Sequence, residues 1–265
     1  MYDKKWGRAI PGHIIFLIDQ SGSMSEGNRA NMTAECVQNS IVEIVRGSVH
    51  GEEVRDRAFI TVIGYGQKND PVKIIRQGWV SEWAEDALEA KKNGTCIIPA
   101  TAEWGTPMTE AFKQAKRCLD EWIAVRDEAH QQKPSESMAA PIVLNITDGA
   151  PDNEQTARDA AKEILNTPTP DGNVLVFNAH MNDEDKKEDQ RPEIICPMDR
   201  NELNGDKNAE FLFDISSPVT EKMIGMAKSI GFETISNGAM GFVANARQAT
   251  LARFIEFGSN VSQHK

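Results

Sequence analysis

Short apolar runs that alternate with helical patterns constrain the fold of this chain more than any other feature of its sequence. Residues 13–18 (HIIFLI) form a continuous apolar run, which is typical of a strand buried on both faces of a parallel sheet. Similar runs at 141–147 and 174–177 are separated from it and from each other by segments whose apolar residues recur at helical spacing. The alternation predicts an α/β fold, with a doubly wound, mostly parallel central sheet and helices on both faces.

One pair of strands departs from this parallel pattern. Residues 57–65 are rich in β-branched and aromatic residues and are predicted to form a strand. Residues 73–80 show a weaker strand pattern, and the turn-forming segment 66–71 separates the two. So short a connection cannot carry a parallel crossover, so we expect one antiparallel edge strand. Helices are predicted over 29–47, 81–92, 108–123, a segment containing 157–165, and 247–257. A further helix should begin at Ser217-Pro218 as cap and first residue and run to about 230, a short strand should cover 240–243, and 207–216 fits either helix or strand.

The chain shows no internal repeat and no linker-like segment. We therefore expect a single domain over residues 1–265. The stretch at about 181–206 is crowded with charged residues and is predicted to be a surface insertion.

Charge and cysteine content exclude several classes of protein. The chain has 29 Lys and Arg against 40 Asp and Glu, a formal charge of −11, so it lacks the basic surface of a nucleic-acid or anionic-membrane binder. Its longest apolar run, 10–18, is far shorter than the roughly 20 residues that span a bilayer, and no signal peptide is expected. The four scattered cysteines form no C-x-x-C pair, so a reducing cytoplasm is the simplest compartment.

Short oxygen-bearing side chains gather where strands end and one helix begins. Asp19, Ser21 and Ser23 follow the first strand, Asp148 follows the strand at 141–147, and Thr106 precedes the helix at 108. Ligands of open parallel sheets bind at the carboxyl ends of the strands, and two carboxylates with three hydroxyls suit a small hard cation such as Mg²⁺. Each group taken singly also fits a local role: an Asx turn with a helix cap at 19–23, a cap at Thr106-Pro107, and a turn at Asp148-Gly149.

The motifs D-Q-S-G-S (19–23), G-T-P-M (105–108) and I-T-D-G (146–149) together resemble the von Willebrand factor A domain with its metal-ion-dependent adhesion site. The likeness covers about 12–180. The later stretch is similar to stand-alone bacterial members of that family, including the tellurium-resistance-associated kind. The resemblance implies that Ser21, Ser23 and Thr106 bind a divalent cation directly, and that Asp19 and Asp148 bind it directly or through water.

The resemblance implies a binding module and not an enzyme. We expect it to hold a protein partner through an Asp or Glu carboxylate on Mg²⁺, with Mn²⁺ or Ca²⁺ as alternatives, in a bacterial stress-response or signalling assembly without nucleic-acid or membrane partners. Two alternatives stay open: a metal-dependent phosphatase or hydrolase that uses Asp19, and a scaffold in which the cluster only caps helices. The five histidines flank no nucleophile motif; we expect His180 to be a surface residue and Trp104 to pack over its own loop.

Overall fold

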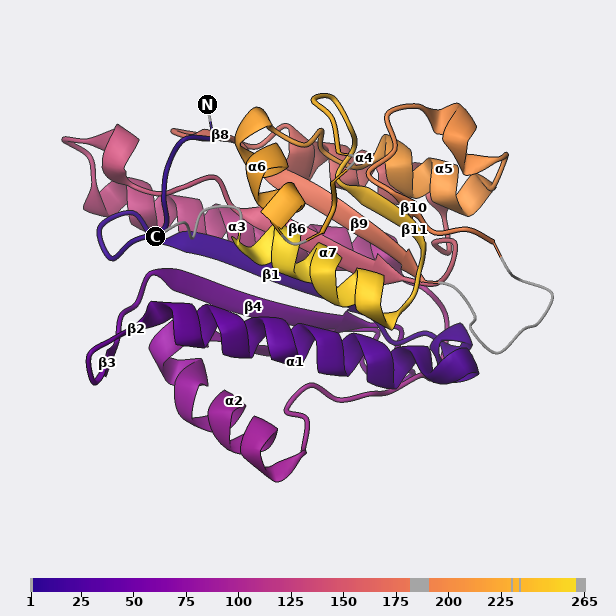
Figure 1. The fold of residues 1–265 in the computed structure, drawn as a ribbon, viewed down its shortest axis with the longest axis horizontal. Helices are drawn as coiled ribbons and strands as arrows, with labels where there is room; N and C mark the ends of the chain where they lie inside the picture. Colours follow the sequence, from indigo (N-terminus) through magenta and orange to yellow (C-terminus); the bar gives the residue numbers. More distant parts are fainter. Residues whose placement is uncertain (1, 182–190, 230, 234, 261–265) are drawn as a thin grey trace.

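A seven-stranded sheet forms the centre of the computed structural model, which describes residues 2–181, 191–229, 231–233 and 235–260. The strand order is β10-β11-β9-β6-β1-β4-β5 (Figure 1). The strands are β1 (Gly12–Asp19), β4 (Ala58–Tyr65), β5 (Val72–Trp79), β6 (Ile142–Thr147), β9 (Leu175–Met181), β10 (Ile194–Ile195) and β11 (Phe242–Ala246). The five central strands pair in parallel, which confirms the expected mostly parallel sheet.

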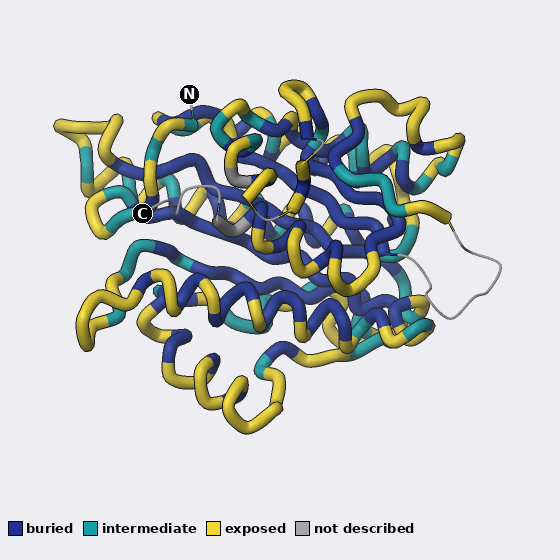
Figure 2. Tube along the Cα trace, viewed as in Figure 1, coloured by how far each residue is buried: buried dark blue, intermediate teal, exposed yellow. Residues whose placement is uncertain are grey.

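Helices cover both faces of this sheet, as predicted. The helices are α1 (Arg29–Ser48), α2 (Val80–Asn93), α3 (Met108–Ala129), α4 (Glu154–Leu165), α5 (Lys207–Asp214), α6 (Glu221–Ser229) and α7 (Gln248–Asn260). Alternate residues of β1 point to opposite faces: Ile14 and Phe16 pack with α1, α2, α6 and α7, whereas Ile15 and Leu17 pack with α3, α4 and α5. The five central strands are buried along nearly their whole length (Figure 2), so the apolar run of β1 reflects burial on both faces.

The two edges of the sheet are both antiparallel. β5 pairs with β4 in that sense, as the short connection predicts. The second antiparallel edge, where β10 pairs with β11, was not predicted, because a strand of two residues leaves no periodic pattern in the sequence. Of the expected surface insertion, 182–190 lies outside the described residues. The described part contains β10, the buried Cys196 and the short 3-10 helix η3 (Arg200–Leu203).

Three local predictions are decided by the structure. Residues 207–214 are helical, because the Asp206 carboxylate accepts hydrogen bonds from the backbone of Asn208 and Ala209 and caps the helix. The predicted helix start at Ser217-Pro218 is wrong. The Ser217 hydroxyl accepts a hydrogen bond from the Val176 amide instead, and α6 begins at Glu221. The strand expected at 240–243 begins two residues later, with β11 at Phe242.

Small hairpins complete the fold. β2 (Val49–His50) pairs with β3 (Glu53–Val54) after the end of α1, and β7 (Pro168–Thr169) pairs with β8 (Gly172–Asn173) after α4. The 3-10 helices η1 (Gly22–Asn28) and η2 (Pro134–Glu136) follow β1 and α3. Among the described residues, no helix is both long and apolar enough to cross a bilayer.

Candidate metal centre

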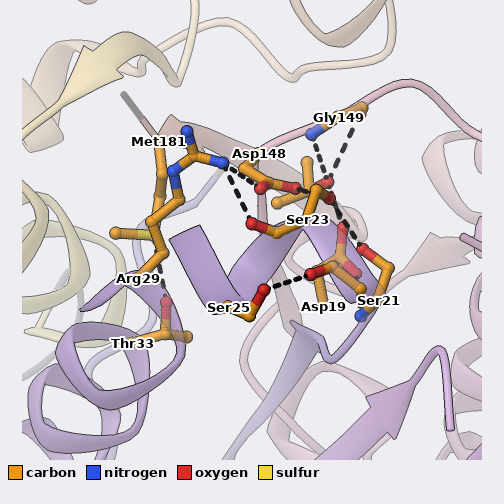
Figure 3. A network of polar contacts seen from close by, with 11 residues as sticks. Asp19, Ser21, Ser23, Ser25, Arg29, Thr33, Asp148, Gly149 and Met181 are labelled. Carbon is orange, nitrogen blue, oxygen red and sulfur yellow. Dashed lines mark hydrogen bonds and ion pairs between the residues drawn. The ribbon is translucent and has the colours of Figure 1, made fainter. Parts of the chain in front are cut away.

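The carboxyl ends of β1 and β6 lie next to each other and bring the predicted residues together. The register of the two strands pairs Ile18 with Ile146, so Asp19 at the end of β1 lies beside Thr147 and Asp148 at the end of β6. Figure 3 shows the side chains of Asp19, Ser21, Ser23 and Asp148 pointing toward one another. The topology of a doubly wound sheet therefore joins two motifs that are more than a hundred residues apart in the sequence.

A continuous chain of oxygen contacts links four of the five predicted residues. The hydroxyls of Ser21 and Ser23 are 3.2 Å apart, and the Ser23 hydroxyl donates to Oδ1 of Asp148 at 2.8 Å. Oδ1 of Asp19 accepts the backbone N–H of Ser21 at 2.8 Å, the contact of an Asx turn. The Asx turn therefore exists, but the Ser21 side chain does not cap the helix that follows it. The Ser21 hydroxyl contacts that of Ser23, which donates to Asp148, and these contacts between separate loops favour a shared ligand over purely local roles.

Asp19 is held in a buried position where the ionised form of its carboxyl is unfavourable. Its side chain has 0% exposure, and Oδ2 accepts the hydroxyl of Thr147 at 2.6 Å. Burial raises the pKa of the Asp19 carboxyl to about 7, although the hydrogen bonds from Thr147 and Ser21 act in the opposite direction. A bound cation would relieve this burial of charge, so Asp19 fits the part of a metal ligand.

The loop that carries Thr106 packs against the turn after β1, whereas no hydrogen bond between described residues joins the Thr106 hydroxyl to the oxygen cluster. The carbonyl of Trp104 accepts the N–H of Gly22 at 2.8 Å, which fixes this loop against the turn after β1. Asp152 then clamps Thr106 from the other side: its carboxylate accepts the Thr106 N–H at 2.8 Å and its own N–H donates to the Thr106 carbonyl at 3.0 Å. Because the cap residue of α3 is Pro107, the alternative of Thr106 as the helix cap is wrong.

Gly66 allows these loops to approach closely. It has a φ of +110°, and a Cβ at this position would lie 2.5 Å from the Ser21 nitrogen and 2.9 Å from the Gly105 carbonyl oxygen. Only glycine combines this backbone conformation with the missing side chain. The end of β4 therefore takes part in shaping the site although it supplies no predicted ligand.

Arg29 is a component of the site that the sequence analysis missed. Its guanidinium forms a short ion pair with Oδ2 of Asp148, and the same nitrogen donates to the Ser23 carbonyl at 3.3 Å (Figure 3). The pair is buried, with side-chain exposures of 9% and 0%. Since Ser23 binds Oδ1 and Arg29 binds Oδ2, the oxygen of Asp148 that faces the cluster is Oδ1. A cation at the first residue of a helix opposes the helix dipole, and this unfavourable placement was the signal in the sequence.

Two further residues differ from expectation. His180 is buried at the end of β9 instead of lying on the surface, and burial lowers the pKa of its imidazole. Trp104 is 61% exposed, so the prediction that it packs over its loop is wrong. An exposed indole beside a candidate binding site offers apolar contact area to an incoming partner.

The donor set decides which ions fit. Across the part of the chain that the structure describes, no three His, Cys, Asp or Glu side chains gather as a metal-binding group. A site built from two carboxylates and hydroxyls contains only hard oxygen donors, which suits Mg²⁺, Mn²⁺ or Ca²⁺ and not Zn²⁺ or copper. The residues present therefore fit a hard divalent cation that retains several waters.

Comparisons with known proteins support the fold. No family model and no curated protein matches the sequence. Among solved structures, the pilus adhesin SpaC from Lactobacillus rhamnosus GG in its open conformation is similar over 81% of this chain and 28% of that chain, with 13% identity and a TM-score of 0.50. Manganese-loaded TRAP protein from Plasmodium vivax is similar over 65% of this chain and 57% of that chain (16% identity, TM-score 0.39). The vWF domain of the pili tip protein Mfa5 from Porphyromonas gingivalis is similar over 54% and 39% (16%, 0.37).

The chain thus spans less than a third of the length of SpaC. At 13% sequence identity, the similarity supports a shared fold and nothing about function. The expected architecture is confirmed: a mixed, mostly parallel seven-stranded sheet with helices on both faces, similar in fold to part of SpaC.

Proposed function

We propose that this protein is a metal-dependent protein-binding module. The observation that carries the proposal is the connected oxygen cluster of Asp19, Ser21, Ser23 and Asp148 at the carboxyl ends of β1 and β6. Ser21, Ser23 and Thr106 would bind the cation directly, and Asp19 and Asp148 directly or through water. When bound, the cation supplies an electrophilic centre that accepts an oxygen ligand from outside.

The charges around the site explain why that outside ligand is a carboxylate. Two aspartates and the Arg29 guanidinium together carry one net negative charge, so a divalent cation leaves the site with a net charge of +1. A carboxylate from an Asp or Glu of the partner neutralises this remaining charge. Because the chain as a whole is strongly acidic, we expect the partner's surface around that carboxylate to be neutral or basic.

Mg²⁺ is the first choice of cation, with Mn²⁺ or Ca²⁺ as alternatives. The cellular setting in the proposal is a cytoplasmic assembly of a bacterial stress response, which rests on the resemblance to tellurium-resistance-associated proteins. Four free thiols, three of them buried, fit a reducing compartment.

A hydrolase that uses Asp19 as nucleophile fits the geometry less well. Asp19 is inaccessible to a substrate, and each of its oxygens already accepts a hydrogen bond. Each oxygen keeps a lone pair that can bind a small cation. The reacting phosphorus or carbon atom of a substrate must come within about 3–3.5 Å of a nucleophile, and the complete burial of Asp19 prevents that approach. Turnover of phosphate esters that depends on Mg²⁺ and is lost in Asp19→Asn would support the hydrolase instead.

The test has two parts. The protein is first titrated with Mn²⁺ to count the bound ions, and the water-proton relaxation rate of the complex is then measured with and without acetate. We expect one bound Mn²⁺, and a decrease in relaxation when acetate is added, because a carboxylate displaces metal-bound water. Ser23→Ala should lose Mn²⁺ binding. Ser25→Ala is the matched control, because its hydroxyl lies in the same turn but donates to the Gly22 carbonyl and not to the cluster. Equal Mn²⁺ binding by both variants would contradict the proposal.

A further inference from the structure

A line of buried polar side chains crosses the sheet beneath the oxygen cluster. Tyr65 on β4, Asn145 on β6 and Asn178 on β9 each have 0% exposure and lie on the face of the sheet that α3, α4 and α5 cover. The Tyr65 hydroxyl donates to Oδ1 of Asn145 at 2.8 Å, and Nδ2 of Asn145 donates to Oδ1 of Asn178 at 3.0 Å. Tyr65 pairs in register with Asp19 where β4 and β1 end. The line therefore begins beside the candidate metal centre and runs into an otherwise apolar core.

Hydrogen bonds to the end of α5 fix the orientation of both amides. Nδ2 of Asn178 donates to the Ser216 hydroxyl at 2.9 Å and to the Leu212 carbonyl at 3.3 Å, so its Oδ1 is left to face Asn145. Asn145 must then offer its NH₂ group to Asn178, because two amide oxygens repel each other, and its Oδ1 is left for Tyr65. The phenol of Tyr65 therefore meets a fixed acceptor.

A second and stronger acceptor lies close to the same phenol. Burial raises the pKa of Tyr65 well above its usual value, the charge of Asp19 raises this pKa further, and a hydrogen bond with Thr147 lowers it. Oδ1 of Asp19 accepts the Ser21 N–H and Oδ2 accepts the Thr147 hydroxyl, so each carboxylate oxygen keeps a lone pair. An O–H donor bonds a carboxylate more strongly than an amide oxygen. Without its bond to Asn145, the Tyr65 hydroxyl would turn to Asp19 and occupy a lone pair that a cation needs.

We propose that Asn145 is a positioning residue of the metal centre, which holds the Tyr65 hydroxyl proton and so leaves the Asp19 carboxylate open to a cation. This role rests on the proposed metal centre. Apolar side chains in place of a hydrogen-bonded polar pair fill the same space at similar stability. Stability alone therefore does not account for the buried amides at 145 and 178, whereas control over the direction of the Tyr65 hydroxyl does.

The experiment is Mn²⁺ titration of Asn145→Leu, Tyr65→Phe and the double variant, at a pH well above the Asp19 pKa of about 7 so that the carboxyl is ionised. Asn145→Leu should weaken Mn²⁺ binding roughly tenfold or more, because a charge-assisted hydrogen bond then competes with the cation for Asp19. Tyr65→Phe removes the competing donor, so this variant and the double variant should both bind Mn²⁺ like the wild type. Circular dichroism checks that each variant folds, and Asn145→Ala replaces Asn145→Leu if the leucine is not accommodated.

The recovery in the double variant separates positioning from packing. If Asn145 only supported the core, the double variant would bind Mn²⁺ at least as weakly as Asn145→Leu, and this result would overturn the proposal, as would unchanged binding by Asn145→Leu. Ser216→Ala is the matched control, because it removes a hydroxyl from the other end of the line and keeps the bond between Tyr65 and Asn145. It should bind Mn²⁺ like the wild type. An equal loss would mean that any loosening of the line weakens the site, which also overturns the proposal.

A measurement on the metal-free protein separates this proposal from that of the metal centre. The chain has two tyrosines, so Tyr2→Phe makes Tyr65 the single reporter in Raman spectra. In EDTA, Asn145→Leu should lower the intensity ratio of the upper to the lower line of the tyrosine doublet, because the phenol then donates to a carboxylate instead of an amide. An unchanged ratio would overturn the proposal whether or not the wild type binds Mn²⁺. The expected change in a protein that binds no Mn²⁺ would contradict the metal centre and still support the hold of Asn145 on Tyr65.

Discussion

Removing the Arg29 guanidinium should destabilise the metal-free protein strongly. The pair of Arg29 with Asp148 has side-chain exposures of 9% and 0%, so Arg29→Met leaves a carboxylate buried without its counter-charge. Breaking a buried ion pair in this way lowers the free energy of unfolding by about 3–5 kcal/mol. For a chain of this length, each kcal/mol shifts the melting temperature by roughly 2–4 °C, so the expected decrease is between about 6 and 20 °C.

The assay is urea unfolding followed by circular dichroism, in EDTA so that no cation compensates Asp148. Arg46→Met is the matched control on the same helix, because Arg46 pairs with Glu43 at exposures of 53% and 49%. Such a surface pair contributes about 0–1 kcal/mol. Adding Asp148→Asn to Arg29→Met removes the uncompensated charge, and the two substitutions should show a coupling of about 1–3 kcal/mol.

A loss in Arg29→Met as small as that in Arg46→Met would refute the reasoning, because the ion pair would then behave as a solvated surface contact. Millimolar Mn²⁺ adds a second test. A dication beside Asp148 replaces the lost counter-charge, so the metal should stabilise Arg29→Met by more than it stabilises the wild type. A smaller metal effect in the variant would show that Arg29 orients Asp148 for the cation and does not compete with it.

Three further predictions concern other parts of the fold. Burial lowers the pKa of His13 to about 3 in the folded protein, compared with 6.5 in the unfolded chain. As the pH decreases below 6.5, only the unfolded chain binds this proton, so the free energy of unfolding decreases as the pH decreases. His13→Gln should therefore remove about 1.4 kcal/mol of the difference in unfolding free energy between pH 8 and pH 5.5, measured by urea unfolding, and an unchanged difference would contradict this. Gly66→Ala should lower the free energy of unfolding by about 1–3 kcal/mol or more, because its Cβ meets the Ser21 backbone; a neutral result would show that the loops can separate. Trp104→Ala should change stability by less than about 0.5 kcal/mol and leave Mn²⁺ affinity intact, since the indole is exposed; a large loss would mean that it supports the site.

The sequence predicts the parts of this fold that depend on periodic patterns. The buried strands β1 and β6 and the long helix α3 have strong, uninterrupted signals, and the structure confirms them. β10 could not be predicted, because two residues at an edge carry no period. The start of α6 was missed for a different reason: a serine followed by proline resembles a helix cap, and the long-range bond from Val176 to Ser217 is invisible in a local pattern.

The same division applies to the candidate site. Asp19, Ser21, Ser23 and Asp148 are predictable because strand ends converge on one edge of a parallel sheet, and the structure brings them together. Their supporting residues are not predictable in this way. Thr147, Asp152 and Arg29 act through hydrogen bonds and charge contacts across separate loops, and such pairings depend on the tertiary fold.

The most direct test of the central claim is thermal unfolding of the wild type and Asp19→Asn, each in EDTA and in millimolar Mg²⁺ or Mn²⁺. A cation that binds only the folded state at 100 times its dissociation constant adds about 2.7 kcal/mol. At roughly 2–4 °C per kcal/mol, the wild type should melt about 5–10 °C higher with metal, and Asp19→Asn should not shift. An equal shift in both proteins, or no shift in the wild type, would contradict a metal centre at Asp19.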